Sequence, residues 1–538
     1  MYRRSSPGQL SFEDFYLPFG GKLSGENRWV KLAELVPWEA FESSYAEQFS
    51  ESQGAPAKSF RMALGALIIK ERLGTTDAET VEQIRENPYL QYFLGFHEYS
   101  DQAPFEASML SHFRQRLSLE LVNQVNARIV EDALAAERAT PTVQNGETGA
   151  ESRDSQTPVE ASSDSEPSSS NESDDEDEPP PPPNQGQLIL DASVAPADIH
   201  YPTDLHLLNA ARASSERILD YLYNAIAQPG MRKPRTYRQQ ARRAYLKVAK
   251  QRRATRRHIR KAIGQQLRYL RRNLGHIRRL VSGGAPLSVL PRFWYRRLLV
   301  IQEVHRQQWH LYQHRQRSIE HRIVSLAQPH VRPIVRGKAG TPVEFGAKIS
   351  ISCVSGYCSL DRLDWEAYHE AADLPRQVEQ YKARHGYYPE SVHADQIYRT
   401  RINRSWCKAH GIRLSGPPLG RPKAGTRAEV DRQAQADAKI RNAVEGKFGQ
   451  GKRRFSLARV MAKLAPSAET AIAITFLVMN LERRLQALRL LFIVILAAVV
   501  SQRGRRNRRR SRGIDSATPW WLSLHAQATP SQLCYPNC

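Results

Sequence analysis

Residues 187–193 read QLILDAS and residues 391–395 read SVHAD. Each stretch is a short apolar run that ends on an acid, Asp191 in the first and Asp395 in the second. Short apolar runs that alternate with helical segments are typical of buried strands in an α/β sheet. In such sheets an acid at the carboxyl end of a core strand lies at the edge where functional sites are found. The two stretches therefore predict an α/β domain that carries both aspartates at one sheet edge.

The alternation of strand and helix continues outward from these two stretches. Residues 343–354 (VEFGAKISISCV) and 411–416 (GIRLSG) have the composition of strands, and residues 364–386 form a helical span between the first of these and residues 391–395. A helix is expected from about 428 to 448, and a last apolar helix is expected to end the domain near residue 485. The sequence thus predicts one α/β domain over residues 187–485.

A third acid, Glu445, falls within the helix expected at 428–448. Arg441 and Glu445 are four residues apart, so they share one face of that helix. Three acids suit phosphodiester cleavage, in which two divalent cations activate the attacking oxygen and stabilise the leaving one. Mg²⁺ takes oxygen ligands, including carboxylates, water and substrate phosphate, and Lys452 is a candidate phosphate contact.

Each of these acids also has a simpler interpretation. An aspartate after a strand is most often a turn or cap residue. Arg441 and Glu445 are equally consistent with a surface ion pair. The residues alone therefore indicate a metal-dependent nuclease only as one interpretation among these.

Positive charge is concentrated in one segment of the chain. The formal net charge is +23, and between residues 231 and 322 there are 26 Lys and Arg against two acids. Helical spacing of apolar residues, broken at Gly283-Gly284, predicts a helical hairpin or coiled pair inserted at about 233–325. Charge runs are usually solvated faces, but a run of one sign repels itself unless a polyanion binds. The segment therefore favours nucleic acid, with these candidate contacts: Arg252, Arg253, Arg256 and Arg257.

Residues 1–136 are expected to form an all-helical N-terminal domain. Ser59 is a cap for a helix that Gly74 ends, and Thr76 with Glu79 forms a capping box for the next helix. A third helix is expected from about Ser108, and its polar face carries Arg114 and Arg116. Three short helices with a basic last one suit a helix-turn-helix that contacts DNA, and an ordinary helical bundle with a solvated face fits equally well.

The remaining segments have compositions that do not support a core. Residues 137–186 are rich in Ser, Glu, Asp and Pro, which predicts an acidic disordered linker. Residues 486–538 are predicted to be a basic disordered tail. The five cysteines form no Cys-x-x-Cys pair, no signal peptide is recognisable at the N-terminus, and no apolar run is long enough to span a membrane. A cytoplasmic, nucleoid-associated protein without a membrane partner is expected.

Several stretches together resemble insertion-sequence transposases of the DDE type, a group sometimes called the IS-five superfamily. The similar stretches are LILDASVAPADIHYPTDLHLLNAAR (188–212), VRPIVRGKAGTPVEFGAKISIS (331–352), HADQIYRTRINRSWCKAHGIRLSGPPLGRPK (393–423), ALIIKERLGTTDAETVEQIRENPYLQYFLGF (66–96) and SMLSHFRQRL (108–117). The spacing of Arg441, Glu445 and Lys452 matches the family's Arg-Glu-Lys motif.

The resemblance implies an RNase H-like mixed-sheet catalytic domain with a long basic helical insertion. It makes Asp191, Asp395 and Glu445 the catalytic metal ligands, with Arg441 and Lys452 as supporting or DNA-contacting residues. The implied cofactor is Mg²⁺, for which Mn²⁺ can substitute. The implied partner is double-stranded DNA, at the element's ends and at the target site, bound by a homo-oligomer.

Two other functions remain open on the sequence. One is a transposase-derived protein that still binds DNA but no longer cuts it. The other is binding to a membrane surface through the basic helices, which would require larger apolar residues opposite the charges. The intact trio of acids favours a DNA-cleaving and strand-transferring enzyme over the first, and the thin, interrupted apolar stripe of the basic helices disfavours the second.

Overall fold

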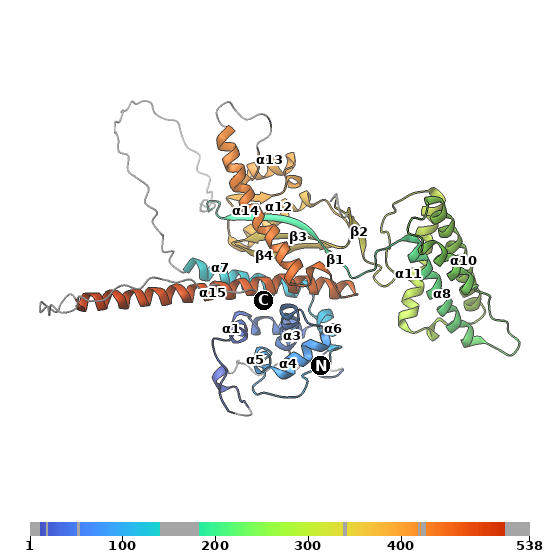
Figure 1. Cartoon of the computed structure of the whole chain (residues 1–538), viewed down its shortest axis with the longest axis horizontal. Helices are drawn as coiled ribbons and strands as arrows, with labels where there is room; N and C mark the ends of the chain where they lie inside the picture. Colours follow the sequence, from blue (N-terminus) through green and yellow to red (C-terminus); the bar gives the residue numbers. More distant parts are fainter. Residues whose placement is uncertain are drawn as a thin grey trace, which may run out of the picture. The chain divides into compact units, whose positions relative to one another are not determined.

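The computed structural model describes residues 11–17, 20–50, 54–139, 182–336, 342–417, 420 and 427–511. The chain divides into two compact units, residues 1–483 and residues 484–538. The first unit holds the N-terminal helices, a mixed sheet and a group of long basic helices (Figure 1). The expected acidic linker lies almost entirely outside the described residues, as do the last 27 residues with Cys534 and Cys538.

Seven α-helices make up the described N-terminal part. They are α1 (Arg28–Leu35), α2 (Glu42–Ala46), α3 (Phe60–Leu73), α4 (Asp77–Glu86), α5 (Pro88–Phe93), α6 (Met109–Arg116) and α7 (Leu119–Ala139). The expected caps are confirmed: the Ser59 side chain accepts from the Met62 amide, and Gly74 ends α3 with a φ of 68°. Thr76 caps α4 by accepting from the Glu79 amide. These local signals fix the ends of α3 and the start of α4.

A mixed sheet confirms the α/β class. Its strands are β1 (Gln187–Pro196), β2 (Arg332–Val335), β3 (Val343–Val354), β4 (Tyr357–Asp364), β5 (Ser391–Ala394) and β6 (Arg413–Leu414). The order is β2-β3-β1-β5-β6, with β4 paired to β3 outside this path. β1 is antiparallel to β3 and parallel to β5, and β5 is parallel to β6. β1 is therefore the strand at which the antiparallel and parallel parts of the sheet meet.

The two faces of β1 pack against different helices. Leu188 and Leu190 join a buried cluster with residues of α12 (Leu374–His385) and α13 (Arg401–Ala409). Successive side chains in a strand point to opposite faces, so Asp191 and Ser193 lie on the other face. That face meets α14 (Arg427–Arg454), because Lys452 of α14 hydrogen-bonds Ser193.

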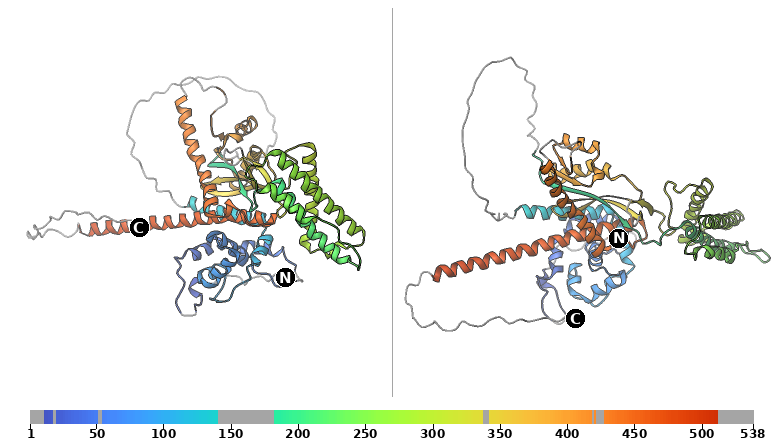
Figure 2. Two further views of the ribbon diagram at one scale, coloured as in Figure 1. Left: turned by 45° about the vertical axis from the view of Figure 1, so that its right-hand side comes forward. Right: turned by 45° about the horizontal axis from the view of Figure 1, so that its top comes forward.

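Three α-helices form the basic insertion in the described part of the chain, where the sequence predicted a helical hairpin or coiled pair. They are α9 (Arg238–Ala249), α10 (Arg256–Ser282) and α11 (Arg292–His314), and α8 (Asp204–Ile226), which precedes the insertion, packs with them in one bundle. α8, α10 and α11 share one apolar core and lie side by side (Figure 2). The expected break at Gly283-Gly284 is confirmed, but α8 was missed as a partner of the basic helices.

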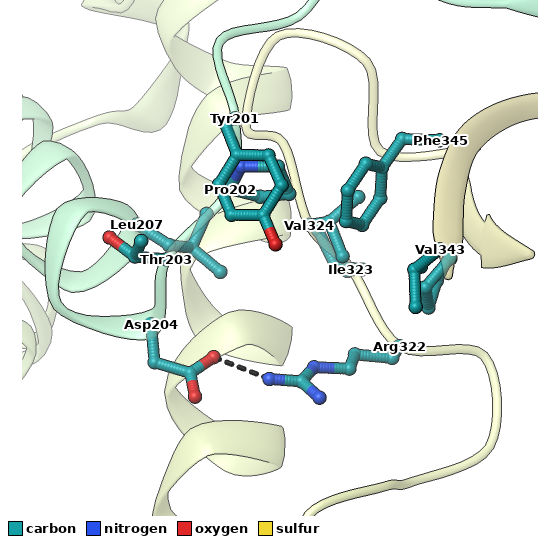
Figure 3. A pocket seen from close by; sticks show the side chains of 11 residues that line it. Tyr201, Pro202, Thr203, Asp204, Leu207, Arg322, Ile323, Val324, Val343 and Phe345 are labelled. Atoms are coloured by element: carbon teal, nitrogen blue, oxygen red, sulfur yellow. Dashed lines mark hydrogen bonds and ion pairs between the residues drawn. The ribbon is translucent and has the colours of Figure 1, made fainter. Parts of the chain in front are cut away.

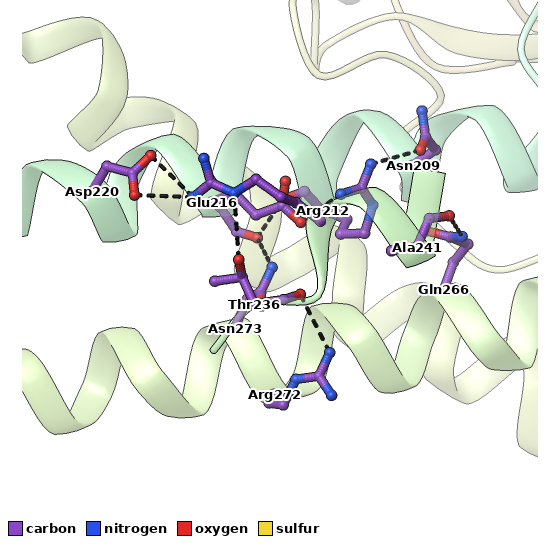
Figure 4. Close-up of polar contacts among 11 residues, drawn as sticks. Asn209, Arg212, Glu216, Asp220, Thr236, Ala241, Gln266, Arg272 and Asn273 are labelled. Carbon is purple, nitrogen blue, oxygen red and sulfur yellow. Dashed lines mark hydrogen bonds and ion pairs between the residues drawn. The ribbon is translucent and has the colours of Figure 1, made fainter. Parts of the chain in front are cut away.

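A polar network lies inside this bundle (Figure 4). The buried side chains of Arg212 and Glu216 pair at 2.5 Å between Nη1 and Oε1. Asn273 of α10 donates to Ser215 Oγ at 3.0 Å, which ties α10 to α8. Gln266 donates to the carbonyl of Ala241 at 3.0 Å, which ties α10 to α9.

The last helix is longer than expected. α15 runs from Ala465 to Ser511, so the helix does not end near residue 485 and residues 486–511 are helical where a disordered tail was expected, although the first compact unit does end at Arg483. The stretch beyond 485 is rich in Leu, Ala and Arg, which favour helix, and it contains no proline before Ser511. Among the helices that the structure describes, none combines the length and apolar character needed to cross a membrane.

Candidate active site

Asp191 and Asp395 are neighbours across two parallel strands. Leu190 of β1 pairs with Ala394 of β5, so the next residue along each strand is an aspartate. Asp191 lies in the middle of β1 and not, as the sequence had predicted, at its carboxyl end, because pairing with β3 continues the strand to Pro196; its Oδ1 accepts from the Ala192 amide at 2.8 Å. Asp395 follows the end of β5, and its Oδ1 accepts from the Gln396 amide at 2.7 Å. The parallel pairing thus brings together two acids that are far apart in the sequence.

The surroundings of Asp191 disfavour its charge. Burial raises the pKa of Asp191 to about 6, and the nearby carboxylates of Glu370 and Asp395 add to the rise. The Ala192 amide and the Arg441 guanidinium act in the opposite direction. A carboxyl group held in this way gains from a nearby cation, which is the environment expected of a metal ligand.

Glu370 is an acid near this site that the sequence did not reveal. It lies in a short 3-10 helix, Glu370–Asp373, and its carboxylate pairs with Lys348 of β3 at 3.3 Å. Glu370 lies in the segment expected to be an ordinary helix, and it follows neither a strand end nor a motif. Only the folded sheet shows that its charge acts on Asp191.

Glu445 lies on α14 and is linked to Asp395 through Arg441. Arg441 Nη1 is 3.0 Å from Glu445 Oε1 and 3.9 Å from Asp395 Oδ1. The side chains of Glu445 and Asp395 are 53% and 57% exposed, so a substrate as large as DNA can reach them. The ion pair considered from the sequence is present, and it also reaches the second aspartate.

Lys452 lies at the other end of the same helix face. Its Nζ donates to Ser193 Oγ at 3.0 Å, and Ser193 is two residues from Asp191 on the same face of β1. A lysine ammonium group is therefore present on the same side of the sheet as the two aspartates. Such a group is suited to contact a phosphate.

The donor set suits a hard divalent cation, but the side chains do not converge as a closed site. Asp191 and Asp395 offer adjacent carboxylate oxygens, and Mg²⁺ commonly takes one or two carboxylates plus water and substrate phosphates. Within the described ranges, no three His, Cys, Asp or Glu side chains are grouped so that they could hold a metal ion. Glu445 is instead paired with Arg441.

The two N-terminal arginines proposed as DNA contacts have partners inside the protein. Arg114 of α6 forms two hydrogen bonds with the Asp77 carboxylate, at 2.7 and 3.2 Å, and its side chain is 12% exposed. Arg116 donates to the carbonyl of Gln48 and lies over the ring of Phe49 at 4.3 Å. These contacts connect α6 with α4 and with the segment that follows α2, and a DNA contact by Arg114 or Arg116 stays a prediction.

The arginines of the basic insertion are differently placed. Arg252, Arg253, Arg256 and Arg257 are all exposed, around the turn between α9 and α10. Thr255 caps α10 by accepting from the His258 amide at 3.3 Å, so the positive end of the helix dipole lies among these arginines. This end of α10 is accordingly suited to a polyanion.

A cavity of about 200 Å³ lies where the chain enters the helical bundle before α8 and leaves it after α11 (Figure 3). Asp204 at the start of α8 pairs with Arg322 at 2.6 Å, and Tyr201 packs edge-on against Phe345. Its lining is Tyr201, Pro202, Thr203, Asp204, Leu207, Arg322, Ile323, Val324, Pro333, Val343 and Phe345. None of the three candidate catalytic acids lines it, so this cavity is separate from the site at the sheet.

Two family models of transposase domains match parts of the chain. A family model described as "Transposase DDE domain" matches residues 392–482, and one described as "Transposase domain (DUF772)" matches residues 18–116. The first match includes Asp395 and Glu445, and the second covers α1 to α6.

One curated relative is similar over part of its length. The "Uncharacterized protein ORF8 in nfe locus" of Rhizobium meliloti is 33% identical over 112 residues, which is 21% of this chain and 54% of that protein. The chain thus spans about half the length of this relative. No solved structure matches the chain significantly.

Proposed function

We propose that the chain is a DDE transposase that binds the ends of a mobile element and cuts and joins DNA there, because two transposase family models match parts of it. One observation carries the proposal. Asp191 and Asp395 are neighbours on parallel strands, and Arg441 links Asp395 to Glu445 on α14. The mixed sheet around these acids supports an RNase H-like catalytic domain over residues 187–485.

In this proposal Asp191, Asp395 and Glu445 would hold Mg²⁺ or Mn²⁺. The metal would supply activation of the attacking oxygen and stabilisation of the leaving one. The protein's own part is to hold the carboxylates together on one face of the sheet. Arg441 and Lys452 lie on that face and are the proposed phosphate contacts near the reacting bond.

In the proposal, the basic insertion binds the DNA backbone, and the helical domain of residues 1–136 recognises the ends of the mobile element. The exposed arginines at the start of α10 support the first assignment, because they lie on a segment with almost no acids. Residues 137–186 and 486–538 are the proposed linker and tail, and a homo-oligomer is the proposed DNA-bound state.

A second candidate is a protein of the same origin that binds DNA but does not cut it. The ion pair between Arg441 and Glu445 favours it, because a glutamate neutralised by arginine is a weaker cation ligand. Substitution of Glu445 distinguishes the two candidates.

The test is Glu445→Gln, which keeps size and helix propensity but removes the charge. Glu445 is exposed, so the fold is expected to persist. Incubation with the element's terminal repeats and Mn²⁺ should show nicked or joined ends for the parent, and about a hundredfold less for the variant. DNA affinity, measured without metal, should change little.

Glu429→Gln in the first turn of α14 is the matched control and should cut normally. Equal cleavage by the Glu445 variant and the parent would mean that Glu445 is only the ion-pair partner of Arg441. A parent that binds the repeats but leaves them intact with Mn²⁺ would support the binding protein instead.

A further inference from the structure

The helix that carries Glu445 is held to the sheet in an unusual way along its first half. α14 has 28 residues, and its buried residues are Asp437, Val444, Phe448 and Gly451. A helix is ordinarily held in place by a stripe of apolar side chains. From Arg427 to Ala443 the one buried side chain of α14 is instead a carboxylate.

Asp437 makes contacts with the two parallel strands at the edge of the sheet. Its Oδ2 accepts from Arg413 Nη1 of β6 at 3.0 Å and from the Gly416 amide at 3.3 Å. Its Oδ1 accepts from Gln433 at 3.1 Å. Nδ1 of the fully buried His393 lies 3.6 Å from the same oxygen, and His393 is two residues before Asp395 on β5.

These partners keep the buried carboxylate charged. Burial by itself raises the pKa of Asp437, but hydrogen bonds from Arg413, Gln433 and the Gly416 amide outweigh it and lower the pKa. Removing one partner of a buried ion pair strongly destabilises the fold, because the charge that remains is no longer compensated. Asp437 therefore forms a specific joint between α14 and β6.

The joint lies in line with the candidate site. Asp437, Arg441 and Glu445 are four residues apart in turn, so they form one ridge along α14. Beyond Glu445 the helix is held by Phe448 and by Lys452, which bonds Ser193 of β1. The segment with Arg441 and Glu445 is thus fixed at both ends, by a carboxylate joint at β5 and β6 and by packing at β1.

We propose that Asp437 is a positioning residue, whose carboxylate docks α14 on β6 and so sets where Glu445 lies relative to Asp395. This inference rests on the proposed function, because it takes Glu445 to be a metal ligand. Asp437 acts through the helix and touches neither metal nor DNA. Its loss should leave DNA binding intact and weaken only the steps that need Glu445 in place.

The test uses the full chain with Asp437→Asn, and Arg413→Gln as a second variant that removes the charge from the other side. Mn²⁺ affinity, measured by electron paramagnetic resonance without DNA, should fall about tenfold in both. Single-turnover cleavage of the terminal repeats should fall about a hundredfold, with the affinity for DNA unchanged. Added Mn²⁺ should restore part of the lost rate, which it would not do for an unfolded protein.

The control is Asp431→Asn, an exposed acid on the same helix, which should match the parent in both measurements. The double variant should be no worse than either single one, because both break the same joint. Parent-like Mn²⁺ affinity in both variants would overturn the inference, whether or not the parent cuts. A parent that fails to cut would instead count against the proposed function, and a tenfold drop in Mn²⁺ affinity would still support the joint.

Discussion

Asp191 is an acid in a place that favours its neutral form. Its pKa of about 6 reflects burial first, and then the charges of Glu370 and Asp395. Native proteins keep such a group where its charge is needed for function, at a cost in stability. Without a bound cation, an ionised Asp191 should therefore weaken the fold.

We predict that Asp191→Asn raises the stability of the metal-free protein at pH 7. The pKa of Asp191 is higher in the folded chain than in the unfolded one, so ionisation favours unfolding. The difference between variant and parent should be fully present above about pH 6 and should vanish below about pH 4. At pH 7 it should amount to roughly 1–3 kcal/mol.

Thermal unfolding in chelator across this pH range measures the effect. Asp431→Asn, which removes an exposed carboxylate, should show no such dependence on pH. If Asp191→Asn melted at the same temperature as the parent at pH 8, the charge of Asp191 would be compensated in the fold.

The candidate site was predictable from the sequence only in part. Asp191 and Asp395 each end an apolar run, and that local signal is visible without a structure. Glu370 and Asp437 carry no such signal, because their importance comes from β3 and β6, which approach them only in the fold. Arg114 was proposed as a DNA contact from its helix face, and that assignment stays a prediction; its pairing with Asp77 on another helix could not be seen from the sequence.

At the scale of the element, caps were predictable and partners were not. Thr76 caps α4 through a residue three positions away, so its sequence contains the whole interaction. The insertion was expected to be a pair of helices, because its charge set it apart from α8. The apolar face of α8 belongs to the same core as α10 and α11, which composition does not reveal.

The polar network inside the bundle that α8 forms with the basic helices gives an element-scale prediction. Arg212 and Glu216 are buried together, and burial raises the pKa of Glu216 in spite of Arg212. We predict that Arg212→Met destabilises the packing of α8 on α10 by about 3–5 kcal/mol, because Glu216 is left without its main partner. Hydrogen exchange of the amides in α8 and α10 reports this local opening.

An exposed pair in the same bundle provides the comparison. Arg306 and Glu303 pair on the surface of α11, and Arg306→Met should leave the exchange of α8 and α10 unchanged. Arg212→Met and Glu216→Leu together should recover much of the loss, because no buried charge remains. A loss in the double variant as large as in Arg212→Met would mean that the network acts through shape and not through charge.

At the scale of the whole molecule, the excess positive charge and the candidate catalytic acids lie in different segments of the chain. Residues 231–322 carry 26 Lys and Arg against two acids, a surplus that accounts for the whole net charge of +23, while the candidate acids lie on the sheet and α14. Deleting residues 233–325 is the direct way to remove the basic insertion. It would also strip α8 of the core it shares with α10 and α11, so a loss of DNA binding could follow from unfolding alone.

Substitution of the exposed arginines avoids this difficulty. We predict that changing Arg252, Arg253, Arg256 and Arg257 together to Gln flattens the salt dependence of DNA binding. The slope of log affinity against log salt changes by about 0.9 for each phosphate that the protein no longer neutralises, so it should change by about two to four. The four side chains are exposed, so the bundle core should be unaffected.

Changing the same four residues to Lys keeps the charge and should keep the slope. If the Gln variant kept the parent's slope while the chain still bound DNA, these arginines would not face the phosphates, and the grip would have to come from other basic residues of the insertion.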